Sequence, residues 1–271
     1  MVKSYFTSLK GLRPQNEDTH VIIENIDNTP IKGGAKHSPA NINFYAIMDG
    51  HGGSKVSHYL KEILPLFFND ARVKYPLQKK YVVNVYDHIQ TKLKETKFAQ
   101  QCGSTSLVVI HFKSGNENYL NIMNVGDCRA VLCRGNFAIP LTKDHKPNMI
   151  EEKHRIEKLG GEIKFDGYDF RIKDLSVSRA FGDVDSAPYV SHRPDIFKYK
   201  LDKTDKFIVI GCDGLYDCLD NTEIINFVLT MCYDPTITKR INQHINISKR
   251  LGDYAISKGS TDNVSVIVVF F

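Results

Sequence analysis

The sequence predicts an α+β fold in which antiparallel β-sheets are covered by helices. Strand-like segments fall in groups separated by helical segments, whereas a doubly wound parallel sheet requires strands and helices to alternate. No stretch rich in proline, glycine or serine divides the 271 residues, and no internal repeat of fixed period is visible. We therefore expect residues 1–271 to form a single domain with a substantial buried core.

The predicted strands are apolar or alternating runs, and several of them border a turn that contains glycine, asparagine or aspartate. In chain order these segments are residues 20–26, 44–50, 105–112, 119–127, 129–141, 207–214 and 260–271. Within the fifth segment, Arg134, Gly135 and Asn136 predict a hairpin turn.

The predicted helices have apolar residues spaced three and four positions apart, which places them on one face. They cover residues 54–68, 78–98, 221–232 and 236–258. Ser54 is a candidate N-cap for the first helix, and Asn221 or Thr222 opens the third.

Composition and charge exclude several classes of protein. The net charge of +5 comes from scattered basic residues, with no concentrated basic face, so we expect no nucleic-acid partner. The apolar run at residues 264–271 is too short to span a bilayer, so we expect no membrane association. Six cysteines without a C-x-x-C pair, and a first segment without an apolar signal core, indicate an intracellular protein of the cytoplasm, the nucleus or both.

Four predicted strands carry an aspartate at one end, beside glycine or asparagine. One Asp-Gly turn has a purely conformational explanation, but four strand ends that met at one sheet edge would bring four carboxylates together. Like charges at close range cost several kcal/mol unless a cation lies among them. The residues concerned are Asp49, Asp127, Asp213 and Asp262.

The types of ligand indicate which cation this would be. Without an H-E-x-x-H motif or clustered cysteines, zinc and iron–sulfur sites have little support, and the EF-hand pattern is absent. A carboxylate set suits Mg²⁺ or Mn²⁺, and Gly50 lets the backbone approach an ion. Arg13 lies in a short acidic turn with Glu17 and Asp18, where its guanidinium could bind phosphate oxygens or simply pair with Glu17 at the surface.

Taken together, these motifs resemble the metal-dependent PP2C (PPM) family of serine/threonine protein phosphatases. The resemblance covers nearly the whole chain, in the order of the family. It is carried by RPQNED (13–18), DGHGG (49–53), GSTS (103–106), NVGDCRAVL (124–132), LTKDHKP (141–147), EEKHRIEKLGGEI (151–163), LSVSRAFGD (175–183), CDGLYD (212–217) and STDNVSVIVV (260–269).

The resemblance implies a four-layer αββα sandwich, in which two antiparallel β-sheets are flanked by helix pairs. It also implies two Mg²⁺ or Mn²⁺ ions at one edge and a weaker third ion. Position by position, the implied metal ligands are Glu17, Asp49, the carbonyl of Gly50, Asp213 and Asp262, with Asp127 for the third ion. Asp18 would hold a metal-bound water.

The implied activity is hydrolysis of phosphoserine and phosphothreonine in protein substrates by a monomeric enzyme. A water that bridges the two ions would attack phosphorus directly, while Arg13 offsets charge on the phosphoryl oxygens. His51 resembles the general acid of the family, although the residue alone would more often have a structural role. The span from Thr142 to Asp174 corresponds to the flap beside the active site, which we expect to shape substrate choice.

The remaining matched stretches are interpreted more simply. The chain departs from the family in the flap, where RIKDLSVS (171–178) lacks the Asn-Gly often found just before Leu175, and at two further positions. GSTS and LSVSRAFGD are assigned to packing and turns. Cys128 stands where serine is common, and Tyr216 where tryptophan is usual. For Cys128, a small buried residue is favoured over an oxidation-sensitive thiol.

Three rival functions remain open from the sequence. A pseudophosphatase would be expected to lose metal carboxylates, all of which are present here. A phosphodiesterase or nuclease would be expected to carry a basic groove. A structural metal-binding module leaves Arg13 and His51 without a purpose.

Overall fold

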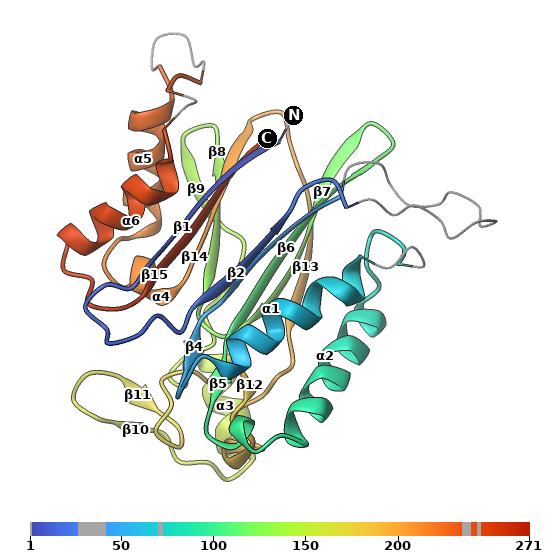
Figure 1. Ribbon diagram of the computed structural model, residues 1–271, viewed down its shortest axis with the longest axis vertical. Helices are drawn as coiled ribbons and strands as arrows, with labels where there is room; N and C mark the ends of the chain where they lie inside the picture. Colours follow the sequence, from blue (N-terminus) through green and yellow to red (C-terminus); the bar gives the residue numbers. More distant parts are fainter. Residues whose placement is uncertain (1, 27–41, 70–72, 235–239, 243–244) are drawn as a thin grey trace.

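Two five-stranded antiparallel sheets pack face to face in the computed structural model, and helices cover their outer faces (Figure 1). The structure describes residues 2–26, 42–69, 73–234, 240–242 and 245–271. Helices α1 and α2 lie on one side of the sandwich, and α5 and α6 lie on the other. This arrangement confirms the predicted α+β fold and its four αββα layers.

The first sheet has the strand order β1-β15-β14-β8-β9, and its strands are β1 (Lys3–Leu9), β15 (Val264–Phe270), β14 (Asp205–Gly211), β8 (Arg129–Arg134) and β9 (Phe137–Pro140). The second has the order β13-β7-β6-β3-β2, and its strands are β13 (Asp195–Lys200), β7 (Glu117–Val125), β6 (Ser106–Ser114), β3 (Asn43–Met48) and β2 (Thr19–Ile23). Every pairing within the two sheets is antiparallel.

Three apolar layers hold the sandwich together. The middle layer lies between the sheets, where Tyr45 and Val109 of the second sheet meet Ile208 and Ile267 of the first. The two outer layers join each sheet to its helix pair. A strand such as β3 is therefore buried on both faces, which is why its sequence is an unbroken apolar run.

Four of the helices agree with predicted segments, with shifts at their ends, and two short ones, at Ile150–Lys158 and Asp213–Tyr216, were not predicted. The helices are α1 (Lys55–Phe68), α2 (Lys79–Lys94), α3 (Ile150–Lys158), α4 (Asp213–Tyr216), α5 (Asn221–Cys232) and α6 (Ile247–Ser257). Ser54 precedes α1, but its side chain makes no capping hydrogen bond. The cap of α5 is Asp220, whose carboxylate accepts a hydrogen bond from the backbone N–H of Glu223. Among the described residues, no helix is long and apolar enough to cross a membrane.

Two predicted helices were too long. The segment predicted at 78–98 ends as an α-helix at Lys94, and a separate 3-10 turn, η1 (Phe98–Gln100), follows it. In the segment predicted at 236–258, residues 236–239 and 243–244 lie outside the described residues. Arg240 forms a β-bridge with Tyr233, and the helix begins only after Asn246, whose side chain caps it.

Smaller elements extend from the sandwich toward the edge where β3, β7 and β14 end. A three-stranded sheet has the order β12-β5-β4 and consists of β12 (Phe181–Gly182), β5 (Gly103–Ser104) and β4 (Gly50–His51). The flap span contains α3 and a hairpin of β10 (Lys164–Phe165) and β11 (Phe170–Arg171). A short 3-10 turn, η2 (Val184–Ser186), follows β12.

Candidate active site

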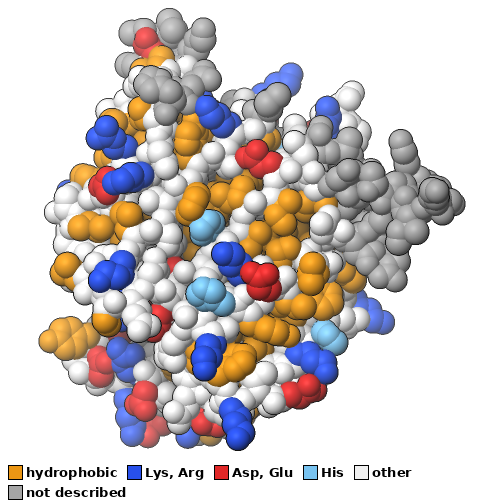
Figure 2. Space-filling view, in the orientation of Figure 1, with side chains coloured by type: hydrophobic (Ala, Val, Ile, Leu, Met, Phe, Trp, Pro, Cys, Tyr) orange, Lys and Arg blue, Asp and Glu red, His pale blue; other side chains and the backbone are white. Residues whose placement is uncertain are grey.

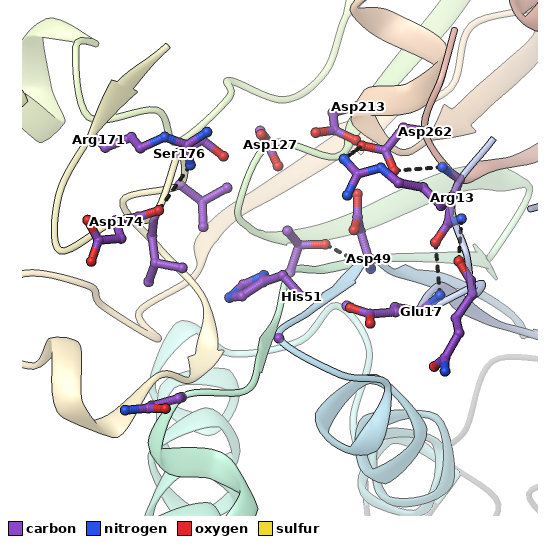
Figure 3. A pocket seen from close by; sticks show the side chains of 18 of the residues that line it. Arg13, Glu17, Asp49, His51, Asp127, Arg171, Asp174, Ser176, Asp213 and Asp262 are labelled. Atoms are coloured by element: carbon purple, nitrogen blue, oxygen red, sulfur yellow. Dashed lines mark hydrogen bonds and ion pairs between the residues drawn. The ribbon is translucent and has the colours of Figure 1, made fainter. Parts of the chain in front are cut away.

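A pocket of about 470 Å³ lies at the edge of the sandwich where the four aspartate-bearing strand ends meet. Strands β3 and β7 both end at this edge, as does β14, while β15 begins there. The sequence-predicted residues that line the pocket are Arg13, Glu17, Asp49, Gly50, His51, Asp127, Asp213 and Asp262 (Figure 3). Asp18 does not line the pocket, because its side chain is buried behind it.

Asp49 and Gly50 are held by contacts with neighbouring strands. The backbone N–H of Asp49 donates to the hydroxyl of Thr105 at 3.0 Å, and the N–H of Thr105 donates to the carbonyl of Asp49 at 2.8 Å. A Cβ at position 50 would lie 2.5 Å from the carbonyl oxygen of Glu17, so only glycine allows this close approach. The predicted turn role of the GSTS stretch is thus visible in the contacts of Thr105.

Asn263 anchors the loop that carries Arg13 and Glu17, a role that the sequence analysis missed. Its side-chain amide donates to the carbonyls of Lys10 at 2.8 Å and Gln15 at 3.0 Å, and its Oδ1 accepts from the N–H of Glu17 at 2.8 Å. This one side chain uses three of its hydrogen-bonding positions on the loop. An asparagine directly after a strand-end aspartate was the available signal.

Arg13 pairs with Asp262 and not with Glu17, which contradicts the surface pairing considered from the sequence. Its Nη2 lies 2.5 Å from Oδ2 of Asp262, while 57% of its side chain stays exposed toward the pocket mouth. A guanidinium has five N–H donors, so Arg13 keeps donors for a further anionic partner.

Burial and mutual repulsion raise the pKa values of the pocket carboxylates. Burial and then the charge of Asp213 raise the pKa of Asp127 to about 8, against the opposing charge of Lys146. Burial, followed by the charges of Asp217 and Asp262, raises the pKa of Asp213 to about 6. These shifts indicate that the residues described by the structure do not neutralise the cluster.

The same is true of the two acids at the back of the cluster. Burial raises the pKa of Asp18 to about 7, and the charges of Asp213 and Asp262 add to this shift. Burial and the charge of Asp18 raise the pKa of Asp49 well above its usual range. In both cases the carboxylate is short of positive charge.

Unpartnered oxygen atoms show that the site fits a hard divalent cation. Neither carboxylate oxygen of Asp18 has a hydrogen-bond partner among the described residues, and Oδ2 of Asp127 also lacks one. Ligand atoms of Asp18, Asp49 and Cys212 lie within 4.8 Å of one another. The sulfur of Cys212 donates to the carbonyl of Asn263 and accepts from the N–H of Ser265, so oxygen atoms remain as the available donors.

Lys146 is a second residue that the sequence analysis did not single out. Its ammonium lies 3.5 Å from Oδ2 of Asp127, and 3.8 Å from both Asp169 of the flap and Asp217 after α4. One positive charge therefore faces three carboxylates and offsets them only in part. The available signal was the second lysine of the LTKDHKP stretch.

His51 makes its contact with Asp183, a third residue that was missed. Its Nε2 lies 2.7 Å from Oδ2 of Asp183. Burial opposes the charged imidazolium, but the hydrogen bond and charge of Asp183, with smaller contributions from Asp127 and Glu17, raise the pKa of His51. Asp183 belongs to LSVSRAFGD, which the sequence analysis assigned to packing and turns alone.

The far wall of the pocket comes from the end of the flap span and the residues after it. Arg171 and Asp174 line this wall together with Leu175, Ser176 and Val177 (Figure 3). Arg171 forms an ion pair with Asp166 and donates to the carbonyl of Asp174 at 3.0 Å. The flap thus faces the predicted metal acids across the pocket.

Cys128, the cysteine beside Asp127, has the environment of a packed core residue. Cys128 is buried, its sulfur lies 3.2 Å from the hydroxyl of Thr105, and burial raises the pKa of its thiol well above the usual range. This environment favours the small buried residue over the reactive thiol. All six cysteines are described, and none forms a disulfide. Figure 2 also shows basic side chains dispersed over one face and interspersed with acidic ones.

Comparisons with known proteins identify relatives along nearly the whole chain. A family profile for Protein phosphatase 2C matches residues 2–264. A PP2C-like domain-containing protein of Acanthamoeba polyphaga mimivirus is 47% identical over 175 residues, which is 59% of this chain and 97% of that protein. An integrin-linked kinase-associated serine/threonine phosphatase 2C of Bos taurus is 32% identical over 99% of this chain and 76% of its own length.

Solved structures share the fold at lower sequence identity. A serine-threonine phosphatase 2C from Toxoplasma gondii superposes with a TM-score of 0.80 at 19% identity, over 100% of this chain and 95% of that one. A C. elegans sex determining protein gives a TM-score of 0.83 at 23% identity, over 99% of this chain and 64% of that one. These likenesses support the fold, while the profile and the closer relatives establish the family. The chain belongs to the protein phosphatase 2C family of serine/threonine phosphatases.

Proposed function

We propose that this chain is a Mg²⁺- or Mn²⁺-dependent protein phosphatase that hydrolyses phosphoserine and phosphothreonine in protein substrates. The observation that carries the proposal is the group of buried and half-buried, under-neutralised carboxylates that shares one pocket with Arg13 and His51. Residues 1–271 would form one catalytic domain that acts as a monomer inside the cell, in the cytoplasm, the nucleus or both.

The acids of the pocket would hold the cations. Two ions would be held by Glu17, Asp49, the carbonyl of Gly50, Asp213 and Asp262, and Asp127 would hold a third, weaker one. Asp18 would accept hydrogen bonds from water beside them, which would satisfy its two unpartnered oxygen atoms. When bound, divalent cations supply Lewis acidity, which lowers the pKa of water and offsets charge on the phosphoryl group.

Arg13 and His51 would act on the substrate. Arg13 keeps part of its guanidinium exposed at the pocket and would bind phosphoryl oxygens as negative charge develops on them. His51 would donate a proton to the departing serine or threonine oxygen, a step that matters most when the leaving group is a poor one. A binding scaffold without activity has no need of this combination, and a nuclease would need phosphate contacts along a groove.

The test is turnover of a phosphothreonine peptide with Mn²⁺, with EDTA, and with a nucleic-acid substrate as the specificity control. We expect release of inorganic phosphate that requires Mn²⁺ and is abolished by EDTA, and no cleavage of the nucleic acid. Phosphate release that is unaffected by chelation would refute the metal dependence. Peptide turnover that is absent in the presence of Mn²⁺ would refute the proposed function.

A further inference from the structure

The small sheet β12-β5-β4 brings together two residues that are 132 positions apart in the chain. Gly103 of the central strand β5 pairs with His51 of β4 on one side. On its other side Gly103 pairs with Gly182 of β12, the residue directly before Asp183. His51 and Asp183 therefore approach each other from opposite edges of β5.

Gly103 leaves the space in which these two side chains meet. A Cβ at this position would lie 2.1 Å from Oδ2 of Asp183 and 2.4 Å from Nε2 of His51, far inside contact distance. With glycine there, Nε2 and Oδ2 come to 2.7 Å, the short distance of a charge-assisted hydrogen bond. Any side chain at position 103 would separate the pair.

Asp183 is rigidly held for this contact. Its side chain is only 2% exposed, and its backbone adopts the left-handed conformation with φ of 45°, which is uncommon for residues other than glycine. Gln90 of α2 clamps the preceding Gly182, donating to its carbonyl at 2.8 Å and accepting from its N–H at 2.9 Å. An uncommon backbone conformation that is so well supported indicates a functional constraint.

We propose that Asp183 is a positioning residue that fixes the imidazole of His51 through Nε2 and leaves Nδ1 for the leaving-group oxygen of the substrate. This inference rests on the proposed function, because His51 lines the pocket of the predicted metal acids. The proton on Nδ1 would pass to the serine or threonine oxygen as the P–O bond breaks. The proton on Nε2 would stay on the ring, and its N–H would remain hydrogen-bonded to Asp183 throughout.

The test compares Asp183→Asn with the parent protein on two aryl esters that differ mainly in the leaving group. Asparagine has the same size and tolerates the left-handed backbone, but it loses the charge that strengthens the bond to His51. For phenyl phosphate we expect kcat/KM to fall about 10- to 100-fold, within the range that a general acid contributes. For p-nitrophenyl phosphate, whose leaving group needs little protonation, the fall should be less than about 3-fold.

Three further variants separate positioning from general damage. Gly103→Ala should show the same selective loss, because its methyl group would push into the pair. Adding Asp183→Asn to His51→Ala should not lower kcat/KM for phenyl phosphate any further, since the two residues act as one unit. The matched control is Asp205→Asn. The carboxylate of Asp205 is fully buried outside the pocket and accepts two hydrogen bonds from Arg134. This variant should leave the ratio of the two kcat/KM values, for phenyl phosphate and p-nitrophenyl phosphate, unchanged.

Equal slowing of both esters in Asp183→Asn, or a further loss in the His51→Ala background, would overturn the inference. A parent protein that hydrolyses neither ester with Mn²⁺ would instead refute the proposed function. The contact can then still be judged from the ¹⁵N chemical shifts of the His51 ring. We expect the Nε2 signal to move in Asp183→Asn, and an unchanged signal would overturn the contact itself.

Discussion

Two groups of buried carboxylates in this molecule have opposite electrostatics. Glu152, on the flap helix α3, is only 3% exposed, yet its pKa is lowered to about 2. Burial opposes that shift, but the hydrogen bonds and charges of Arg179 and Arg155 outweigh it. Asp127 and Asp213, in the pocket, have their pKa values raised to about 8 and about 6.

The two pKa shifts differ in sign because the cationic partners of the carboxylates differ. Both oxygens of Glu152 are occupied, because Arg155 and Ser178 donate to one oxygen and Arg179 donates to the other. In the pocket, Lys146 reaches Asp127 only at 3.5 Å, and the cluster keeps unpartnered oxygen atoms. Glu152 is neutralised by its own chain, whereas the pocket carboxylates are not neutralised by the described residues, which is typical of a site that binds a charged ligand.

The first prediction, which has the greatest magnitude, concerns the carboxylates of the pocket. Asp213→Asn should lower turnover of a phosphothreonine peptide by about 10⁴-fold, or about 5.5 kcal/mol in barrier height, because a metal site contributes several kcal/mol. Without metal, the variant should be at least as stable as the parent protein at pH 7.5, since it removes one repelling charge. Steady-state kinetics and thermal melts check both, with the exposed Asp253→Asn as control. Normal turnover would show that Asp213 is not a metal ligand.

The second prediction concerns Glu152, the carboxylate that its arginine partners neutralise. Glu152→Gln should destabilise the fold by about 3–5 kcal/mol, because it leaves the half-buried guanidinium of Arg155 without a counter-charge and that of Arg179 with Asp195 alone. Urea unfolding of the two proteins measures the difference in free energy of unfolding. A loss below about 1 kcal/mol would place this ion-pair network in the class of surface pairs and contradict its structural role.

The third prediction concerns the pH dependence of stability, which should have opposite signs for the pocket carboxylates and for Glu152. Without metal, the raised pKa values of Asp18, Asp127 and Asp213 mean that the folded state binds more protons than the unfolded state from about pH 4 to pH 8. Their contribution to stability therefore falls as pH rises through this window. Glu152 has the opposite sign, because its contribution is complete above its ordinary pKa of 4.5 and is lost as pH falls toward about 2.

Mn²⁺ should reverse the effect of the pocket group, since cations bind the deprotonated acids. At 100 times its dissociation constant the ion adds about 2.7 kcal/mol. For a chain of this length that corresponds to a rise in Tm of roughly 5 °C. Differential scanning fluorimetry should show a larger Mn²⁺-induced rise at pH 8 than at pH 5. An equal or smaller rise at pH 8 would contradict the assignment of the raised pKa values to the metal acids.

The sequence was most informative where a pattern repeats within a few residues. The unbroken apolar runs of β3 and β14 and the spacing in α1 and α5 identified these elements closely. Strands β1 and β13 were missed, because they lie at sheet edges and mix polar with apolar residues as half-exposed strands do. What holds them is pairing with β15 and β7, and those partners are far away in the chain.

By itself, the sequence determined the α+β class, with helices over antiparallel sheets, and placed an aspartate at each of the four strand ends that border the pocket. The order of the four layers followed only from the family resemblance and is confirmed by the structure. Periodicity and turn chemistry are local, so neighbouring residues are enough to show them. Only the tertiary structure decided which side chains meet: Asp183 with His51, Asn263 with the Arg13 loop, and Lys146 with Asp127. These contacts depend on pairing register and on the space left by residues such as Gly103, and local sequence carries neither.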